Sequence, residues 1–225
     1  LSCIYTGLMG PGVNNYLKNL PKAASQLPSS VFENDENRWK ERFSDISSMR
    51  GSENPYALHS ELAEAMISNV LIVRENDKLQ STLDVIEDIE SRWKDIECVD
   101  TQDWSNPVPS FVNQLWNMIQ LSKIITMGAL KRDEFRGSHY KPEFDLNQPD
   151  DFDPADYLEY EEQKANGGVH KDQFAPSHVD YMERFEKNNE DWLKSSIATY
   201  NNGKPAVDFE SVDTSLIAPR PRKYD

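Results

Sequence analysis

Apolar residues recur at every third or fourth position in three stretches of the chain, which is the spacing of one face of an α-helix. The first stretch, behind a plausible Asn54-Pro55 cap, has Leu58, Leu62, Met66 and Val70. The second has Leu79, Leu83, Ile86, Ile89, Trp93 and Ile96. The third, with Ser110 as the expected N-cap, has Phe111, Leu115, Met118, Leu121, Ile125 and Ala129. These patterns predict an antiparallel three-helix bundle, similar to a spectrin repeat, over residues 55–140.

The segments before the bundle differ from it in composition. Residues 1–20 hold a short apolar stretch and then a predicted helix to Leu20, with Pro11 in its first turn. Residues 21–54 are rich in Pro, Ser, Asn and charge. This composition is typical of a linker or surface insertion, here with one possible helix over Glu36–Phe43.

The segments after the bundle are acidic at first and then extended. Residues 141–191 are expected to form a surface insertion with two short helices, over Pro154–Lys164 and Ser177–Lys187. Residues 192–225 predict a strand, a turn at Asn201-Asn202-Gly203, a second strand and an extended basic tail. The expected fold is therefore mainly α, with a small α+β C-terminal tail.

Charge and composition exclude several classes of function. The formal net charge of −15 argues against nucleic-acid binding and against adsorption to an anionic membrane surface. No apolar run approaches the roughly 20 residues that cross a bilayer. The two cysteines, Cys3 and Cys98, are too few for a disulfide framework or a zinc site, which favours a reduced, intracellular setting. The sequence opens at Leu1, without an initiator Met and without a basic leader. We therefore expect it to be a piece that begins inside a larger fold.

Candidate chemistry is sparse along the chain. A metal site at His170 and His178 is conceivable, but their spacing matches no common ligand pair. The one dense polar cluster is Lys131–Tyr140 at the end of the third predicted helix. Here Gly137 is expected to end the helix in a left-handed conformation, and Arg136 and His139 either form ion pairs there or contact a cofactor or neighbouring domain. These features alone predict an acidic helical bundle with an extended tail.

Several stretches, in order, resemble the C-terminal portion of succinate dehydrogenase and fumarate reductase flavoproteins. Residues 128–144, Gly-Ala-Leu-Lys-Arg-Asp-Glu-Phe-Arg-Gly-Ser-His-Tyr-Lys-Pro-Glu-Phe, are similar to that family's Arg-x-Glu-Ser-Arg-Gly-Ala-His pattern and the segment after it. Asn189–Lys194 is similar to the family's Asp-Asp-Glu-x-Trp-Leu, Val212–Tyr224 to the subunit's end, and Leu1–Gly7 to the residues that follow a segment against the flavin. This sequence departs from the family at Phe135, Ser138 and Asp145 and in an apparent insertion over residues 145–188.

The resemblance implies a flavoprotein that interconverts succinate and fumarate by hydride transfer to FAD. Electrons would then pass to an iron–sulfur subunit, and from there to a membrane quinone-binding anchor. The flavoprotein would lie peripherally on the cytoplasmic face of a bacterial inner membrane. The family's catalytic and flavin-attaching residues lie before Leu1, so no residue of this chain is expected to be catalytic.

The resemblance also assigns roles to individual residues. Residues 1–20 would be the last helix of an FAD-binding domain, with Leu1, Ser2 and Cys3 near the flavin. Structural or subunit-contact roles are expected for Arg136, Gly137, His139, Arg220, Arg222 and Lys223. No metal ligands are expected. Two alternatives stay open, a related flavoprotein such as an aspartate oxidase and a stand-alone helical interaction module.

Overall fold

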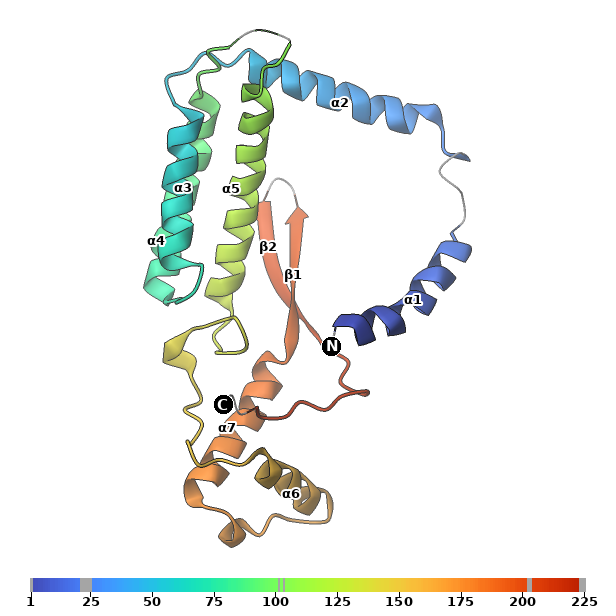
Figure 1. The fold of residues 1–225 in the computed structure, drawn as a ribbon, viewed down its shortest axis with the longest axis vertical. Coiled ribbons are helices and arrows are strands. Elements are labelled where there is room, and N and C mark those ends of the chain that lie inside the picture. The colour runs from blue at the N-terminus through green and yellow to red at the C-terminus, as the bar shows by residue number, and fades with distance from the viewer. Residues whose placement is uncertain (1, 21–25, 101, 103, 202–203, 223–225) are drawn as a thin grey trace. The chain divides into compact units, whose positions relative to one another are not determined.

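The computed structural model describes residues 2–20, 26–100, 102, 104–201 and 204–222, with the backbone alone for residues 2–9. The chain divides into two compact units, residues 1–48 and 49–225 (Figure 1). None of the helices in these described stretches is both long enough and apolar enough to cross a membrane.

The first unit holds two helices, α1 (Ser2–Lys18) and α2 (Ser29–Ser47). The placement of Pro11 in a first turn is wrong, because α1 begins nine residues earlier and Pro11 lies inside it. Helix α2 is also longer than the expected Glu36–Phe43. Contacts one turn apart stabilise its middle, including the Lys40–Glu36 ion pair at 2.6 Å and the neighbouring rings of Trp39 and Phe43.

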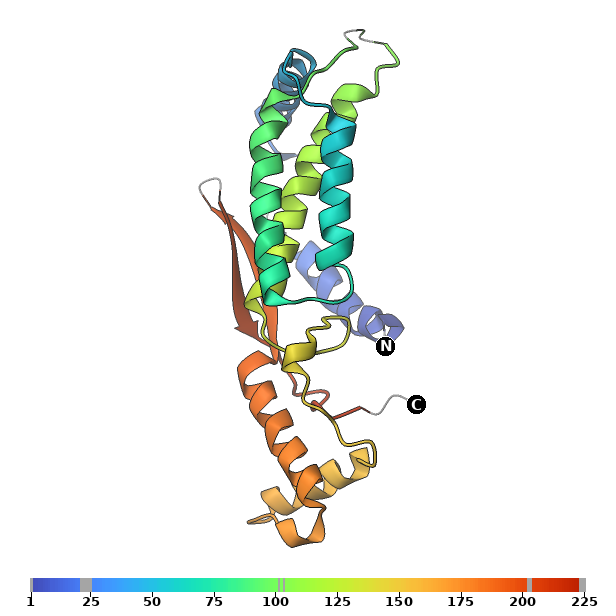
Figure 2. The ribbon, with the colours of Figure 1, turned by 90° about the vertical axis from the view of Figure 1, so that its left-hand side faces the viewer.

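The second unit contains the predicted three-helix bundle, formed by α3 (Pro55–Asn69), α4 (Asn76–Arg92) and α5 (Val108–Lys131). Figure 2 shows these helices side by side. The expected Asn54 cap is confirmed, because its side-chain oxygen accepts from the backbone N–H groups of Tyr56 at 2.9 Å and Ala57 at 3.4 Å. The bundle core consists mainly of aliphatic residues, namely Leu58, Leu62, Leu79, Ile86, Ile89, Ile96, Val112, Leu115 and Ile119.

The buried face of α5 differs from the predicted one. The buried residues are Val112, Asn113, Leu115, Ile119, Ser122, Thr126 and Ala129. Leu121 and Ile125, predicted to be core, are 62% and 49% exposed. The rest of the second unit covers the side of α5 that carries Ser122 and Thr126 and leaves the side with Leu121 and Ile125 open. Ser110 is not the N-cap either, since α5 begins at Val108 after Pro107.

Backbone hydrogen bonds join the start of the second unit to the residues just after α4. Helix α4 continues into the 3₁₀ turn η2 (Trp93–Asp95), and residues 50–53 pair with residues 95–97. Gly51 makes the close approach possible, because a Cβ atom there would lie 1.9 Å from the carbonyl oxygen of Asp95.

The expected acidic insertion has a hydrophobic core of its own. It contains η3 (Pro142–Phe144), α6 (Pro154–Ala165), η4 (Lys171–Gln173) and α7 (Pro176–Trp192). Its core is largely aromatic, with Phe152, Tyr157, Tyr160, Phe174, Val179, Tyr181, Met182 and Phe185. The segment is therefore a small packed helical layer, and most of its acidic residues are exposed.

The predicted hairpin is present as β1 (Lys194–Asn201) and β2 (Lys204–Ser211), paired antiparallel from Lys194 opposite Ser211 to Asn201 opposite Lys204. Most of the expected turn, residues 202–203, lies outside the described residues. The hairpin lies along α5 in Figure 1, where the Lys131 ammonium donates to the carbonyl of Val207 at 2.8 Å.

Candidate functional site at the end of helix α5

The polar cluster predicted at residues 131–140 begins where α5 stops. The helix ends at Lys131, and Arg132 is already extended. Gly137 therefore does not end the helix, contrary to the expectation from the sequence. It lies six residues beyond the helix end, with φ of +59°, in a tight turn closed by two backbone hydrogen bonds between Arg136 and His139. The left-handed conformation of Gly137 was predicted correctly, but it allows this turn to form and does not end the helix.

Glu134 is the centre of the cluster. Its side chain is 1% exposed and accepts from the guanidinium groups of Arg132 and Arg136, the latter at 2.8 Å. Asn188 of α7 donates to the same carboxylate at 3.3 Å, and Arg136 also donates to Asn189 at 2.8 Å. Two arginines and two amides thus join the end of α5 to the end of α7 around one buried carboxylate.

Arg132 extends this network to the hairpin. Its guanidinium donates to the backbone carbonyls of Trp192, at 3.0 Å, and Lys194. It also lies over the rings of Phe209 and Trp192, with its central carbon 5.2 Å and 5.9 Å from the ring centres. A planar, delocalised cation can bind carbonyls in its plane and stack on rings at its face, so this position suits arginine.

His139 joins two elements of the bundle. Its Nδ1 lies 2.7 Å from the guanidinium of Arg74, and its Nε2 lies 2.9 Å from the carbonyl oxygen of Arg132. Because an arginine can only donate, Nδ1 accepts and Nε2 carries the proton. Burial lowers the pKa of His139, and the positive charges of Arg74 and Lys141 lower it further, so the ring is held neutral.

Lys141, which was not singled out from the sequence, caps α5. It is fully buried, and its ammonium donates to the carbonyls of Leu130 at 3.2 Å and Arg132 at 3.1 Å and to Asp133 at 2.8 Å. The Leu130 carbonyl is one of the acceptors that a helix C-terminus leaves unsatisfied. A lysine ten residues beyond a helix end gives no sequence signal for this role, because the chain reverses in between.

The structure describes the other predicted site residues only in part. Leu1 is outside the described residues, and Ser2 and Cys3 form the backbone of the first turn of α1. Arg220 and Arg222 are not buried, whereas Pro221 between them is, so the tail is packed at that proline. Lys223 lies outside the described residues.

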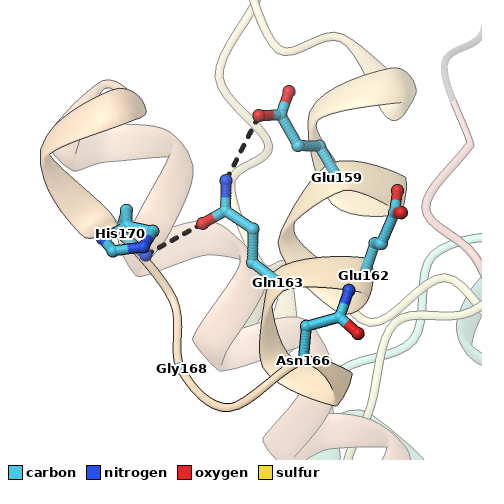
Figure 3. Close-up of a pocket in the computed structure, with 6 residues that line it drawn as sticks. All are labelled: Glu159, Glu162, Gln163, Asn166, Gly168 and His170. Atoms are coloured by element: carbon cyan, nitrogen blue, oxygen red, sulfur yellow. Dashed lines mark hydrogen bonds between the residues drawn. The ribbon is translucent and has the colours of Figure 1, made fainter.

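A shallow polar depression of about 320 Å³ lies at the end of α6 (Figure 3). Gln163 crosses it, donating to Glu159 at 3.2 Å and accepting from the backbone N–H of His170 at 2.8 Å. His178 is held elsewhere, by Asp151 and Asp156. The structure thus gives the two histidines separate partners, and within the described residues no group of His, Cys, Asp or Glu side chains is arranged so that it could hold a metal ion.

Comparison with known proteins identifies the family. The sequence pattern described as "Fumarate reductase flavoprotein C-term" matches residues 59–224. The matched range includes the bundle core except for Leu58, and also the polar cluster and the hairpin. This chain belongs to the fumarate reductase flavoprotein C-terminal family. The family resemblance predicted from the sequence is therefore confirmed.

Individual relatives agree with this assignment. The chain is 38% identical over its full length to a succinate dehydrogenase flavoprotein subunit of Bacillus subtilis, of which it covers 32%. It is 31% identical over 133 residues, 59% of the chain, to one of the subunits of the CoM/CoB fumarate reductase of Methanothermobacter marburgensis, of which it covers 23%. The chain thus spans a third or less of the length of these relatives.

The fold also matches a solved structure of an E. coli quinol fumarate reductase variant. The TM-score is 0.60 at 18% identity, over 88% of this chain and 27% of the solved one. This likeness confirms the mainly α fold with its small two-stranded tail.

Proposed function

We propose that these 225 residues are the C-terminal part of the flavoprotein subunit of a succinate dehydrogenase or fumarate reductase. The intact subunit interconverts succinate and fumarate, and bound FAD supplies the hydride chemistry. The observation that carries the proposal is the end-to-end alignment, at 38% identity, with a succinate dehydrogenase flavoprotein subunit.

Within that subunit, this part supplies structure and contact surfaces. Arg136, Gly137 and His139 hold the bundle to the segments that follow it, since their partners lie on α7, on the α3–α4 loop and within the turn itself. In the sequence, Arg220, Arg222 and Lys223 make a basic stretch on an otherwise acidic chain, suited to an acidic surface elsewhere in the complex.

The family resemblance supports a place beside the flavin for the start of α1. Helix α1 (Ser2–Lys18) has no acidic residue in its first described turn, so no carboxylate there would oppose a negatively charged flavin. Leu1, Ser2 and Cys3 would contact the flavin edge.

The proposal also sets the organisation of the chain. Residues 1–20 end an FAD-binding domain, 21–54 link it to the bundle at 55–140, 141–191 are an acidic insertion, and 192–225 form the tail. The partners are an iron–sulfur subunit, which is bound directly, and a membrane anchor that binds quinone and is reached through it. The flavoprotein lies peripherally on the cytoplasmic face of a bacterial inner membrane.

The test is to purify the complete subunit that ends in these residues and to measure its flavin content and succinate-dependent dye reduction. We expect bound FAD and dye reduction that fumarate reverses. Flavin-free protein, or flavin-loaded protein that reacts with neither succinate nor fumarate, would contradict the proposal. Residues 1–225 expressed alone are the control and are expected to bind no FAD.

A further inference from the structure

Four aliphatic side chains are exposed where α3 turns into α4. Ile67, Leu71, Ile72 and Val73 are 64%, 61%, 66% and 42% exposed, and together they form what we call the α3–α4 patch. Large aliphatic residues exposed in a group, rather than singly, are typical of an interaction surface.

Arg74 lies directly beside this patch and is fixed in position. Its backbone N–H donates to the carbonyl of Tyr140 at 3.0 Å, and its Nε donates to the carbonyl of Val70 at 2.8 Å. One terminal nitrogen donates to His139 at 2.7 Å. The first bond fixes the backbone of Arg74 and the other two hold its guanidinium, so little side-chain entropy remains to be lost on binding.

The charge of Arg74 has no carboxylate partner among the described residues. Burial alone lowers its pKa, with no acidic group acting in the other direction. Arg92 differs, since it binds Glu53, Glu61 and Asp88, which raise its pKa. His139, held neutral, gives Arg74 no countercharge either. A half-buried cation without a partner is costly, and a carboxylate at its second terminal nitrogen would remove that cost.

We propose that the α3–α4 patch binds an apolar protein segment that carries an Asp or Glu, whose carboxylate pairs with Arg74. The segment belongs to the part of the flavoprotein subunit that lies outside these 225 residues, so this inference rests on the proposed function. Arginine suits such a pair because its weakly hydrated, two-pronged group binds carboxylates well in partly apolar surroundings.

The length of the relatives and the chemistry of the patch favour this occupant. The chain covers 32% of the succinate dehydrogenase flavoprotein subunit that it matches, which leaves most of such a subunit to provide the segment. An exposed aliphatic group around an unpaired arginine requires permanent cover, as in obligate interfaces. A segment of the same polypeptide is always present at high effective concentration, whereas a separate chain can dissociate.

A photo-cross-linking experiment in the complete subunit tests this. Ile72 is replaced by p-benzoylphenylalanine, and the cross-linked peptides are mapped by mass spectrometry, in the isolated flavoprotein and in the assembled complex. Tyr56, 51% exposed at the other end of α3, carries the same probe as the control. We expect Ile72 to cross-link to an apolar peptide of the same polypeptide that contains Asp or Glu. Arg74→Glu should lower that yield at least about ten-fold, which corresponds to about 1.4 kcal/mol.

Three results would overturn the inference. They are a yield at Ile72 no higher than at Tyr56, a cross-link to a different subunit, and a yield that Arg74→Glu leaves unchanged. Because Arg74→Glu also removes the bond to His139, Ile72→Asp provides a second test on an exposed side chain. We expect it to lower the melting temperature of the complete subunit by about 2 °C, because a large protein shifts less for a given loss of stability, and an unchanged melting temperature would contradict the inference.

Failure of the proposed function would be distinguishable. If the complete subunit reacted with neither succinate nor fumarate but still showed the Arg74-dependent cross-link, the result would support the interface and contradict the assigned reaction. If it showed succinate-dependent dye reduction without the cross-link, the result would support the reaction and contradict the interface.

Discussion

Buried charges decide how this chain is held together at the scale of single residues. Glu134 and Lys141 are almost fully buried, yet each has several partners within hydrogen-bonding distance. Such groups add little net stability compared with apolar residues, but removing one partner leaves the others buried and unpaired. Substitutions within the cluster should therefore cost more than their individual hydrogen bonds.

Glu134→Gln tests this expectation. The neutral amide removes the charge that Arg132 and Arg136 share, and we expect the free energy of unfolding to fall by about 3 kcal/mol. Glu162→Gln is the control, because Glu162 is exposed at the end of α6 and should change stability by less than about 0.5 kcal/mol. Urea unfolding followed by circular dichroism measures both. Equal, small effects would show that the cluster contributes little.

His178 makes one part of the fold sensitive to pH. Its two ring nitrogens lie 2.9 Å from Asp156 and 3.2 Å from Asp151. A neutral imidazole has one N–H and can donate to only one of them, whereas the imidazolium donates to both. Burial lowers the pKa of His178, but hydrogen bonds to Asp151 and Asp156 outweigh it, so the folded-state pKa is raised above 6.5.

The sign of the pH effect follows from that raised pKa. The stability that the protonated ring provides is fully present below pH 6.5 and is lost as the pH rises through the folded-state value. The free energy of unfolding of wild type should therefore exceed that of His178→Gln at about pH 6, and this difference should disappear by about pH 8. Unfolding free energies of the two proteins at both pH values measure this. An advantage that grows with pH would contradict the assignment.

At the scale of elements, the hydrophobic pattern predicts the bundle but misplaces the buried face of α5. The prediction followed apolar residues at helical spacing, whereas the structure buries Ser122 and Thr126 and leaves Leu121 and Ile125 exposed. Burial depends on which side neighbouring helices cover, and Thr126 faces α3 through Met66, whose sulfur lies 3.6 Å from its hydroxyl. The sequence of α5 alone does not contain that information.

Two aliphatic residues of α5 test this register directly. Ile119 is fully buried and Leu121 is 62% exposed, two positions apart on the same helix. Ile119→Ala should lower the free energy of unfolding of the chain by about 3 kcal/mol, whereas Leu121→Ala should change it by less than about 0.5 kcal/mol. Equal costs in urea unfolding, or a larger cost at Leu121, would support the predicted face instead.

The helices α6 and α7 show a similar limit. Both were expected from the sequence, but not their shared core, because acidic residues dominate the composition of this segment. The apolar signal is nevertheless present in α7, where Val179, Met182 and Phe185 recur at spacing three.

The polar cluster was also located by its composition alone. Its centre, Glu134, was not singled out, because burial of a charged residue depends on partners that are distant in sequence.

At the scale of the whole molecule, the basic tail contrasts with a chain of net charge −15. If Arg220, Arg222 and Lys223 bind an acidic surface, deleting residues 219–225 from the complete complex should lower its flavin content or its retention of the iron–sulfur subunit. Co-purification and flavin absorbance measure these two quantities. Full retention of both, with unchanged quinone reduction, would exclude an assembly role for the tail.

Turnover per bound flavin in the intact subunit tests the central claim most directly, namely that this part of the chain serves structure and assembly while the chemistry lies elsewhere. The variant is Arg136→Ala, which breaks the contacts to Glu134 and Asn189. We predict a lower melting temperature with turnover per flavin within about two-fold of wild type. A fall of about 100-fold in turnover, with flavin content, folding and assembly of the complex unchanged, would contradict the account and place Arg136 in the reaction.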